Sequence, residues 1–242
     1  MRYSLPPMLD ISKIRAITLD LDDTLWPIWP TIVRAEAAMS DWLSPHAPLT
    51  AALFTQADRR LALRQEVQRA RPDIGHDLGT LRREIIRLAL QRLGENTALV
   101  EPAYEVFFSE RQRVDLYEDA KPALQWLSRR FPVLSLSNGN ADVHRVGLGE
   151  FFLGGLSAQD FGVGKPDPRI FHAAAKAVGV EPHEVLHVGD DAALDVLGGL
   201  AAGMQTVWVN RAGHAWSHEE SPHATVADMA QLCALLETAG VS

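Results

Sequence analysis

The chain of 242 residues contains a single cysteine, Cys233. No internal disulfide can form, so we expect a reducing compartment such as the cytoplasm. The sequence also lacks any run of about 18 apolar residues, which excludes an ordinary membrane-spanning helix. Its first residues, MRYSLPPMLDISK, lack the apolar stretch of about 7–15 residues that a secretory signal requires.

Basic residues are in short supply, with 23 lysines and arginines against 31 acidic residues and a net charge of −8. We therefore expect no nucleic acid partner and no binding to membrane surfaces, since both depend on basic clusters. Apolar residues form 47% of the chain and charged residues 22%, which excludes a disordered or fibrous protein. At roughly 150 residues per domain, the length fits one large domain or a core with an insert.

Short runs of β-branched and apolar residues predict buried strands over residues 16–21, 132–137, 184–189 and 205–210. Helical patterns lie among them, over residues 120–130, 167–178 and 192–202. A closing helix is expected over residues 226–238, after a turn-rich stretch at 211–223. Strands that alternate with helices predict a doubly wound, Rossmann-like α/β core with a parallel sheet.

Residues 28–113 contain no convincing strand, and helical periodicity dominates them. The stretch LRREIIRLALQRLG has one apolar face, formed by Leu81, Ile85, Leu88 and Ala89. Gly94 stands where a C-terminal helix cap belongs. We therefore predict an all-helical domain over residues 26–115, inserted into a core formed by residues 1–25 and 116–242.

The first predicted strand runs into the sequence Asp20-Leu21-Asp22-Asp23-Thr24. Residues two apart in an extended chain point to the same side, so Asp20 and Asp22 can converge where the strand ends. Parallel sheets bind ligands at that end. Two close carboxylates resist joint ionisation unless a cation or a shared proton relieves their repulsion. A turn with local Asp hydrogen bonds is the alternative interpretation of this motif alone.

Three further motifs follow. Ser137-Asn138-Gly139 ends the second core strand and offers a hydroxyl and backbone N–H groups to a phosphate, although such a sequence is usually only a turn. Lys165 precedes a helix start in GKPDP; by itself it would be a solvated surface charge. The stretch HVGDDAALD gathers three acids that suit a hard divalent cation, namely Asp190, Asp191 and Asp195.

These motifs, in the order DxDxT, SNG, Lys-Pro and GDDxxxD, resemble the haloacid dehalogenase-like hydrolase superfamily, and the helical insert is similar to its α-helical cap. The SNGN turn, the GHD of the insert and the stretch EVLHVGDDAALDVLGGLAAGMQTVWVN look most similar to one branch. That branch holds bacterial phosphatases acting on flavin mononucleotide and on 5-amino-6-(5-phospho-D-ribitylamino)uracil. The resemblance covers the whole length and implies Mg²⁺-dependent hydrolysis of a small phosphorylated metabolite, with no obligate protein partner.

The resemblance also implies a role for each motif residue. Asp20 would be the nucleophile that becomes an aspartyl-phosphate, and Asp22 the general acid and base. Mg²⁺ would be bound by the carboxylates of Asp20 and Asp190 and the backbone carbonyl of Asp22. The phosphate would be held in a site fixed by Thr24, Ser137, the Asn138 backbone and Lys165. Asp195 would support the metal ligands, and Asp191 would either do the same or bind the metal.

Asp22 favours a phosphatase over a 2-haloacid dehalogenase, because an alkoxide needs a proton to leave and a halide does not. A sugar-phosphate phosphomutase and a non-catalytic regulatory protein of the same fold are further alternatives.

The insert is expected to set substrate choice by closing over the site. Residues 58–92 contain nine arginines and five acidic residues, a net charge of +4, which could attract an anionic substrate. Candidate substrate contacts are His76, Asp77 and Arg82. Trp26 and Trp29 would either stack on a planar ring or pack in the hinge.

Three other features are expected to be structural. His214 and His218 lie in a turn-rich loop without further zinc ligands nearby. His187, in the middle of a predicted strand, is interpreted as a packed core histidine. Cys233 lies in an apolar helical run, which indicates a small buried residue rather than a reactive thiol.

Overall fold

The structure is a computed structural model that describes residues 8–238, so the first seven residues examined for a secretory signal lie outside the described part. The chain forms two compact units. Unit 1 combines residues 1–27, 116–139 and 143–242, and unit 2 combines residues 28–115 and 140–142. Among the described helices, none is both long and apolar enough to cross a lipid bilayer.

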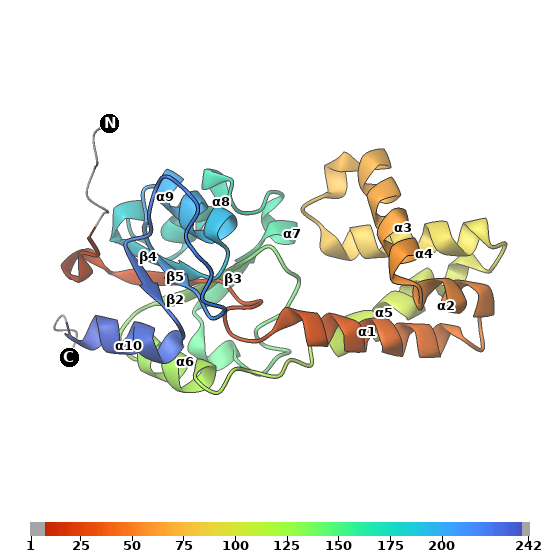
Figure 1. Cartoon of the computed structure of the whole chain (residues 1–242), viewed down its shortest axis with the longest axis horizontal. Helices are drawn as coiled ribbons and strands as arrows, with labels where there is room; N and C mark the ends of the chain where they lie inside the picture. Colours follow the sequence, from red (N-terminus) through yellow and green to blue (C-terminus); the bar gives the residue numbers. More distant parts are fainter. Residues whose placement is uncertain (1–7, 239–242) are drawn as a thin grey trace. The chain divides into compact units, whose positions relative to one another are not determined.

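Unit 1 is built on a six-stranded sheet in the order β3-β2-β1-β4-β5-β6, and all neighbouring strands are parallel (Figure 1). The chain runs outward from β1 on both sides, which confirms the predicted doubly wound α/β core. The strands are β1 (Ala16–Leu19), β2 (Val133–Ser137), β3 (Gly154–Ser157), β4 (Val185–Gly189), β5 (Gln205–Val209) and β6 (Ala224–Val226).

The four apolar runs form the buried strands β1, β2, β4 and β5, each shorter than predicted by one or two residues. The edge strands β3 and β6 were not predicted, because they have only four and three residues and β3 begins with two glycines. Close packing requires the glycine at position 155, because a Cβ there would lie 2.2 Å from Ser135 Oγ on the neighbouring strand.

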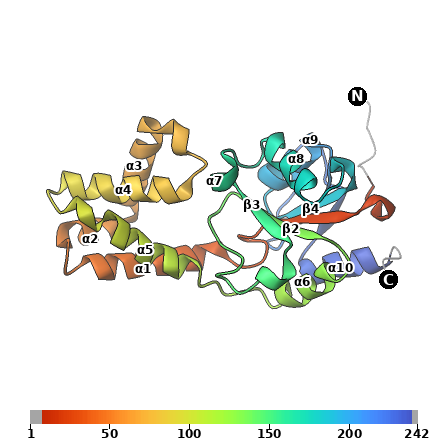
Figure 2. The same cartoon turned by 180° about the vertical axis from the view of Figure 1, so that it is seen from behind.

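Helices cover both faces of the sheet, with α8 and α9 on one face and α6 and α10 on the other (Figures 1 and 2). The core between β2, β4 and α8 includes Leu136, Phe171 and Val185. The helices of unit 1 are η1 (Ile11–Lys13), α6 (Ala120–Ser128), η4 (Gly149–Phe151), α7 (Ala158–Phe161), α8 (Pro168–Ala177), η5 (Pro182–Glu184), η6 (Ala192–Leu197), α9 (Gly198–Ala201) and α10 (Met229–Thr238).

Two predicted helices need correction. The helix expected over 192–202 is divided into a π-helical segment, η6, and the short α9. The closing helix begins at Met229 rather than at 226, because Ala224–Val226 pairs with β5 as strand β6. The stretch 211–223 contains neither helix nor strand, as predicted.

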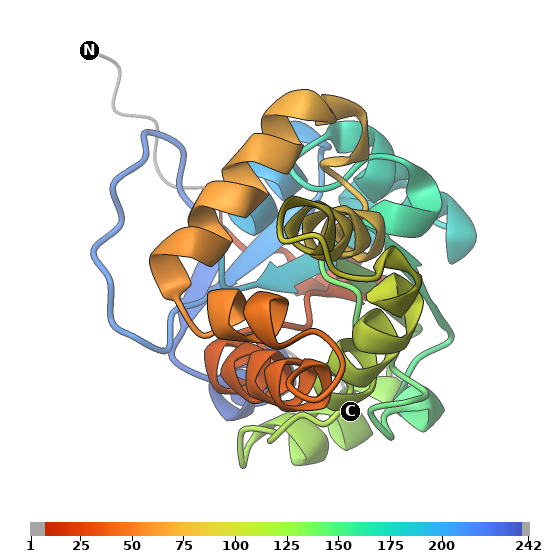
Figure 3. The same cartoon turned by 90° about the vertical axis from the view of Figure 1, so that its right-hand side faces the viewer.

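Unit 2 is entirely helical, as expected for residues 28–113 (Figure 3). Helices α1 and α5 lie side by side along their lengths (Figures 1 and 2). A separate hydrophobic core joins them, with Met39, Ile86 and Ala103 fully buried. The elements are α1 (Ile28–Leu43), α2 (Pro48–Phe54), α3 (Ala57–Ala70), η2 (Pro72–Ile74), α4 (Leu78–Arg92), η3 (Thr97–Leu99) and α5 (Val100–Arg111).

The predicted apolar face of α4 is confirmed for Leu81, Ile85 and Ala89, which are buried, whereas Leu88 is half-buried. Gly94 has a φ of 69°, and the N–H of the next residue returns to Leu90 O at 2.9 Å. This is the left-handed cap that the sequence predicted.

Candidate active site

The motif residues of unit 1 meet at the carboxyl ends of β1, β2 and β4, which are neighbours in the sheet. Asp20 directly follows β1, and its backbone N–H donates to Val188 O on β4 at 2.9 Å. Asp190 directly follows β4, and Ser137 is the last residue of β2. Parallel pairing thus gathers residues that lie more than a hundred positions apart in the sequence.

Lys165 lies at the centre of this group and its side chain is only 2% exposed. Its ammonium donates to Asp20 Oδ1 and to Asp195 Oδ1, both at 2.6 Å. Burial opposes the positive charge, but Asp195 and Asp20 raise the pKa of Lys165 above its ordinary value. The lysine is therefore a fixed internal cation rather than a solvated surface charge.

Asp195 is fully buried and has partners on both oxygens. Besides Lys165, its Oδ1 accepts from His187 Nε2 at 3.0 Å, and its Oδ2 accepts from the Asp191 backbone N–H at 2.9 Å. Burial alone would favour the neutral acid, but Lys165 and His187 hold the pKa of Asp195 well below its usual range. Gly189 makes room for this carboxylate, since a Cβ there would lie 2.2 Å from Asp195 Cγ.

Asp191 and Asp195 have different surroundings, and the sequence left Asp191 open between metal ligand and supporting residue. The exposed side chain of Asp191 caps η6, where its Oδ1 accepts from the N–H groups of Ala193 and Leu194, both at 2.8 Å. Asp195 instead points toward Lys165. Asp191 thus caps the helix that carries Asp195.

Asn138 fixes the position of Lys165 through a pair of side chain to backbone hydrogen bonds. Its Oδ1 accepts from the Lys165 N–H at 2.7 Å, and its Nδ2 donates to Lys165 O at 2.8 Å. Gly164 leaves space for this contact, because a Cβ there would lie 2.5 Å from Asn138 Oδ1. Ser137 Oγ accepts from the Gly139 N–H at 2.9 Å, which closes the turn after β2.

Thr24 is completely buried and lies between two site carboxylates. Its hydroxyl donates to Asp190 Oδ1 at 3.0 Å and lies 3.5 Å from Asp20 Oδ2. The turn that returns the chain to this point includes Asp23, whose φ of 59° is in the left-handed region. Thr24 thus connects the end of β1 to the end of β4.

Trp26 and Trp29 differ in their surroundings. Trp26 is 0% exposed, which excludes stacking on a bound ring, and its indole N–H donates to Asp22 Oδ1 at 2.8 Å. Trp29 is 72% exposed and lies on α1 of unit 2. Of the two roles predicted for Trp26, stacking or packing, the structure therefore supports packing. Trp26 also donates a hydrogen bond to the motif residue Asp22.

Carboxylates outnumber cations in this group, and the pKa values reflect the imbalance. Asp20, Asp190 and Asp195 place ligand oxygens within 4.8 Å of one another, with Lys165 as the ammonium in contact with Asp20 and Asp195. Burial and the charge of Asp195 raise the pKa of Asp190 to about 7, against the hydrogen bond from Thr24. Burial raises the pKa of Asp20 well above its ordinary value, although Lys165 opposes the shift.

This group fits a divalent cation. Asp195 accepts three hydrogen bonds, from Lys165, His187 and the Asp191 N–H, whereas Asp20 and Asp190 accept fewer, so the carboxylates of Asp20 and Asp190 have more lone pairs left for a metal ion. Hard cations prefer such oxygen ligands, and a nearby positive charge would favour ionisation of both acids.

The raised pKa of Asp190 predicts a pH-dependent stability for the metal-free protein. The folded chain keeps a proton that the unfolded chain loses between pH 3.8 and about 7. We therefore expect the free energy of unfolding to fall as the pH rises through this window, by at most about 4 kcal/mol. Asp190→Asn has no charge to acquire, so it should be more stable than wild type above about pH 7.

Chemical denaturation across the pH range measures both quantities. A divalent cation should stabilise wild type above about pH 7, because it binds the ionised acid, and should stabilise Asp190→Asn much less. If Asp190→Asn were no more stable than wild type above about pH 7, ionisation of Asp190 would not lower the free energy of unfolding.

Three supporting residues were not assigned to the site from the sequence. His187 is buried as predicted, but it also links Asp195 to Thr18 Oγ1, which lies 2.8 Å from its Nδ1. Trp208 Nε1 donates to Asp190 O at 2.7 Å, and Arg211 donates to Thr24 O at 2.9 Å. The contact between Thr18 and His187 had a signal in the sequence, because each is a polar residue within an otherwise apolar strand. The pairing of β1 with β4 places the two opposite each other.

In unit 2, two of the candidate substrate contacts, Asp77 and Arg82, have internal partners. Asp77 caps α4 by accepting from the Thr80 N–H at 2.8 Å. Arg82 pairs with Glu36 at 2.5 Å and lies over the Phe107 ring at 4.1 Å. His76 is half-buried. Substrate contact by these residues stays a prediction.

The remaining features, His214, His218 and Cys233, are not part of this group of carboxylates and Lys165. Within residues 8–238, the group of potential metal ligands contains neither His214 nor His218, and the ring of His218 packs on Trp216. Cys233 is half-buried, and burial raises its pKa to about 11, which disfavours the reactive thiolate.

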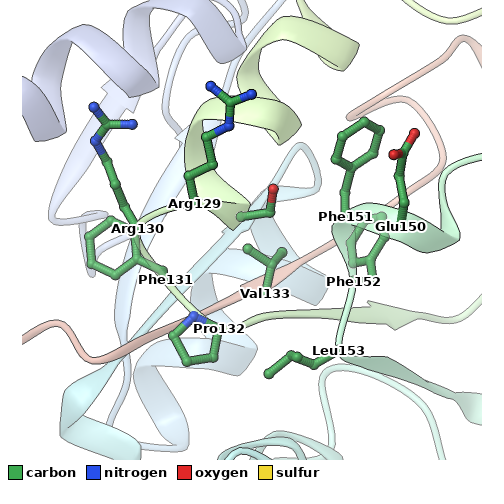
Figure 4. Close-up of a pocket in the computed structure, with 10 residues that line it drawn as sticks. Arg129, Arg130, Phe131, Pro132, Val133, Glu150, Phe151, Phe152 and Leu153 are labelled. Atoms are coloured by element: carbon green, nitrogen blue, oxygen red, sulfur yellow. The ribbon is translucent and has the colours of Figure 1, made fainter.

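A pocket of about 330 Å³ lies beside the start of β2 (Figure 4). It is lined by Arg129, Phe131, Pro132, Val133 and Leu153, among others. Val133 begins β2, whereas Ser137 ends it. This pocket therefore lies at the amino end of β2, and the carboxylates lie at the carboxyl ends of the strands.

Comparisons with known proteins find similarity over most of the chain. The family model for haloacid dehalogenase-like hydrolases matches residues 14–203. The chain is 32% identical over 234 residues to the 5-amino-6-(5-phospho-D-ribitylamino)uracil phosphatase YigB of Escherichia coli strain K12, covering 93% of this chain and 98% of that protein. It is 37% identical over 160 residues to a phosphoserine phosphatase of Thermus thermophilus, covering 64% of each chain.

A similar fold is seen in a crystal structure of 2-haloacid dehalogenase from Pseudomonas syringae pv. tomato DC3000, with a TM-score of 0.87 and 35% identity. The match covers 94% of this chain and all of that one.

Proposed function

The chain belongs to the haloacid dehalogenase-like hydrolase family, and from this premise we propose that it is a cytoplasmic, Mg²⁺-dependent phosphatase acting through an aspartyl-phosphate. It is an enzyme, and it hydrolyses the phosphate monoester of a small metabolite, as its phosphatase relatives support. The observation that carries the proposed mechanism is the pair Asp20 and Asp22 on one short segment, with Lys165 bound to Asp20 at 2.6 Å.

In the first half of the reaction, a carboxylate oxygen of Asp20 attacks phosphorus, and the bond from phosphorus to the ester oxygen breaks. Asp22 gives its proton to that oxygen, so the alcohol leaves as a neutral molecule. Lys165 has three N–H donors, of which two point to Asp20 and Asp195. The third is proposed to hold a phosphoryl oxygen, together with Ser137 and the Asn138 N–H.

In the second half, water attacks the phosphorus of the aspartyl-phosphate. Asp22, now ionised, accepts a proton from this water. The bond to Asp20 breaks, inorganic phosphate is released and both carboxyl groups return to their initial states. Mg²⁺ held by Asp20, Asp190 and the Asp22 backbone carbonyl would offset the charge of the phosphoryl group.

The proposed substrate class comes from the relatives. A phosphorylated riboflavin precursor or flavin mononucleotide is the first choice, since the relative that aligns over 93% of this chain is named for such a precursor. A sugar phosphate or a nucleotide is the second. A 2-haloacid dehalogenase is the rival function, because a structure of that name has the TM-score of 0.87.

We further propose that the helical domain over residues 26–115 is the cap that selects the substrate. Its support is the all-helical unit at 28–115 and the positive charge of residues 58–92. No obligate protein partner enters this proposal.

Release of inorganic phosphate from a panel of esters tests the function. The panel contains flavin mononucleotide, 5-amino-6-(5-phospho-D-ribitylamino)uracil, phosphoserine, sugar phosphates and nucleotides, each with and without Mg²⁺. Chloride release from 2-chloropropionate is measured in parallel. Mg²⁺-dependent phosphate release without chloride release is expected; the reverse pattern would establish the dehalogenase.

Asp22→Ala separates proton transfer from the other steps. We expect this variant to bind Mg²⁺ through Asp20 and Asp190 but to hydrolyse esters of poorly acidic alcohols roughly 100-fold more slowly or worse, since their alkoxides need a proton to leave. Hydrolysis of p-nitrophenyl phosphate should fall less, because p-nitrophenolate leaves unprotonated. Full activity of the variant on alkyl esters would refute the role of Asp22.

A further inference from the structure

Asp22 contacts the indole of Trp26, which belongs to the same loop. The indole Nε1 donates to Asp22 Oδ1 at 2.8 Å. The backbone of this loop is closed by the Asp23 N–H, which donates to Trp26 O at 2.7 Å, and by the Leu25 N–H, which donates to Leu21 O at 2.8 Å. The two side chains are therefore held together by a tight local turn as well as by their own hydrogen bond.

The indole is fixed while the carboxylate is accessible. Trp26 is 0% exposed, and its ring is among the largest completely buried side chains. Asp22 is half-buried. A ring packed in this way rarely changes rotamer, so its N–H defines one direction in which Asp22 Oδ1 must point.

Indole nitrogen only donates hydrogen bonds. The carbonyl oxygen of a neutral carboxyl group is a better acceptor than its hydroxyl oxygen, so the indole favours the form of Asp22 with Oδ1 as the carbonyl oxygen and the proton on Oδ2. Resting on the phosphatase function proposed above, we infer that Trp26 is a positioning residue that holds Asp22 Oδ1 and assigns the proton transfer to Oδ2. In the reaction, Oδ2 then gives the proton to the leaving oxygen and later accepts one from water.

Replacing the indole tests this inference through leaving-group selectivity. Trp26→Phe and Trp26→Met both remove the N–H but leave side chains of different shape. For each, kcat/KM, which reports the steps up to formation of the aspartyl-phosphate, is measured on p-nitrophenyl phosphate and on the alkyl phosphate that wild type hydrolyses fastest. The ratio of the alkyl kcat/KM to the p-nitrophenyl kcat/KM should fall roughly tenfold or more, because in this first half of the reaction only the alkyl leaving group needs the proton of Asp22.

The design keeps folding separate from positioning. Partial unfolding lowers both rates equally and leaves their ratio unchanged, so the p-nitrophenyl rate counts the active molecules in each sample. Trp208→Phe is the matched control, since its indole donates to the Asp190 main chain rather than to an acid; it should change both rates by the same factor. Trp126→Phe on α6, whose ring packs under Arg130, should change neither.

A double variant gives the second readout. In an Asp22→Ala background, Trp26→Phe should not lower the ratio further, because the group that it positions is gone. An unchanged ratio in both single variants, or an equal further fall in the double variant, would overturn the inference. If wild type releases no phosphate from any ester, the proposed function itself fails and this inference fails with it.

Discussion

Asp20→Asn is expected to lower Mg²⁺-dependent phosphate release by roughly 1,000-fold or more, because the amide is a poor nucleophile and cannot form the aspartyl-phosphate. The change keeps the shape of a buried side chain and leaves Lys165 with its second partner, Asp195. The fold should therefore survive. Initial rates on the best ester of the panel, with the melting temperature of each sample, measure the effect.

A matched control separates nucleophile loss from a general effect of removing an acid. Asp228 caps α10 by accepting from the Gln231 N–H at 2.8 Å, and asparagine can accept the same bond. Asp228→Asn should keep nearly full activity. Acid quenching during turnover should yield a phosphorylated peptide containing Asp20 from wild type. Appreciable release by Asp20→Asn, or phosphate on another residue, would assign the nucleophile elsewhere.

Lys165→Met should cost about 3–5 kcal/mol of the free energy of unfolding and abolish measurable phosphatase activity. The methionine fills similar space but removes the ammonium that bonds Asp20 and Asp195 at 2.6 Å each. Asp195 is 2% exposed, so its charge is then left in the interior with His187 as its side-chain partner. Urea or guanidinium denaturation at neutral pH measures the loss.

A compensating double variant shows where that loss originates. Lys165→Met combined with Asp195→Asn removes both charges of the buried pair, so it should recover part of the stability of the single variant without recovering activity. Lys176→Met, the same chemical change at an exposed position on α8, should alter stability by no more than about 0.5 kcal/mol. A single variant as stable as wild type would mean that the pair at Lys165 contributes little to the fold.

The parallel sheet was predictable because its central strands are continuous apolar runs, a pattern that leaves few other structures for β1, β2, β4 and β5. The edge strands were not, since Gly154–Ser157 and Ala224–Val226 are too short and too weakly apolar to be recognised without a neighbour. Their pairing is decided by the strand beside them. The π-helical segment after Asp191 was not predictable either, because its local composition is that of an ordinary α-helix.

The chemistry of the site was visible as motifs, but the contacts among them were not. Sequence analysis proposed Lys165 as a phosphate contact, and in the structure it also lies between Asp20 and Asp195. The sequence left Asp191 open between metal ligand and supporting residue; in the structure it caps a helix, whereas Asp195 accepts from Lys165 and His187. These distinctions depend on side-chain direction across three separate chain segments.

The sequence by itself determined the order of the strands and motifs and the residue types placed at each strand end, since these follow from local apolar patterns and from Asp, Ser and Lys at particular positions. The tertiary structure alone decided which oxygen meets which donor across the site: Asn138 on the Lys165 backbone, Thr24 on Asp190, and Lys165 on Asp20 and Asp195. Hydrogen bonds form only when donor and acceptor lie about 3 Å apart. That spacing is set by packing between segments far apart in the chain, which local sequence does not encode.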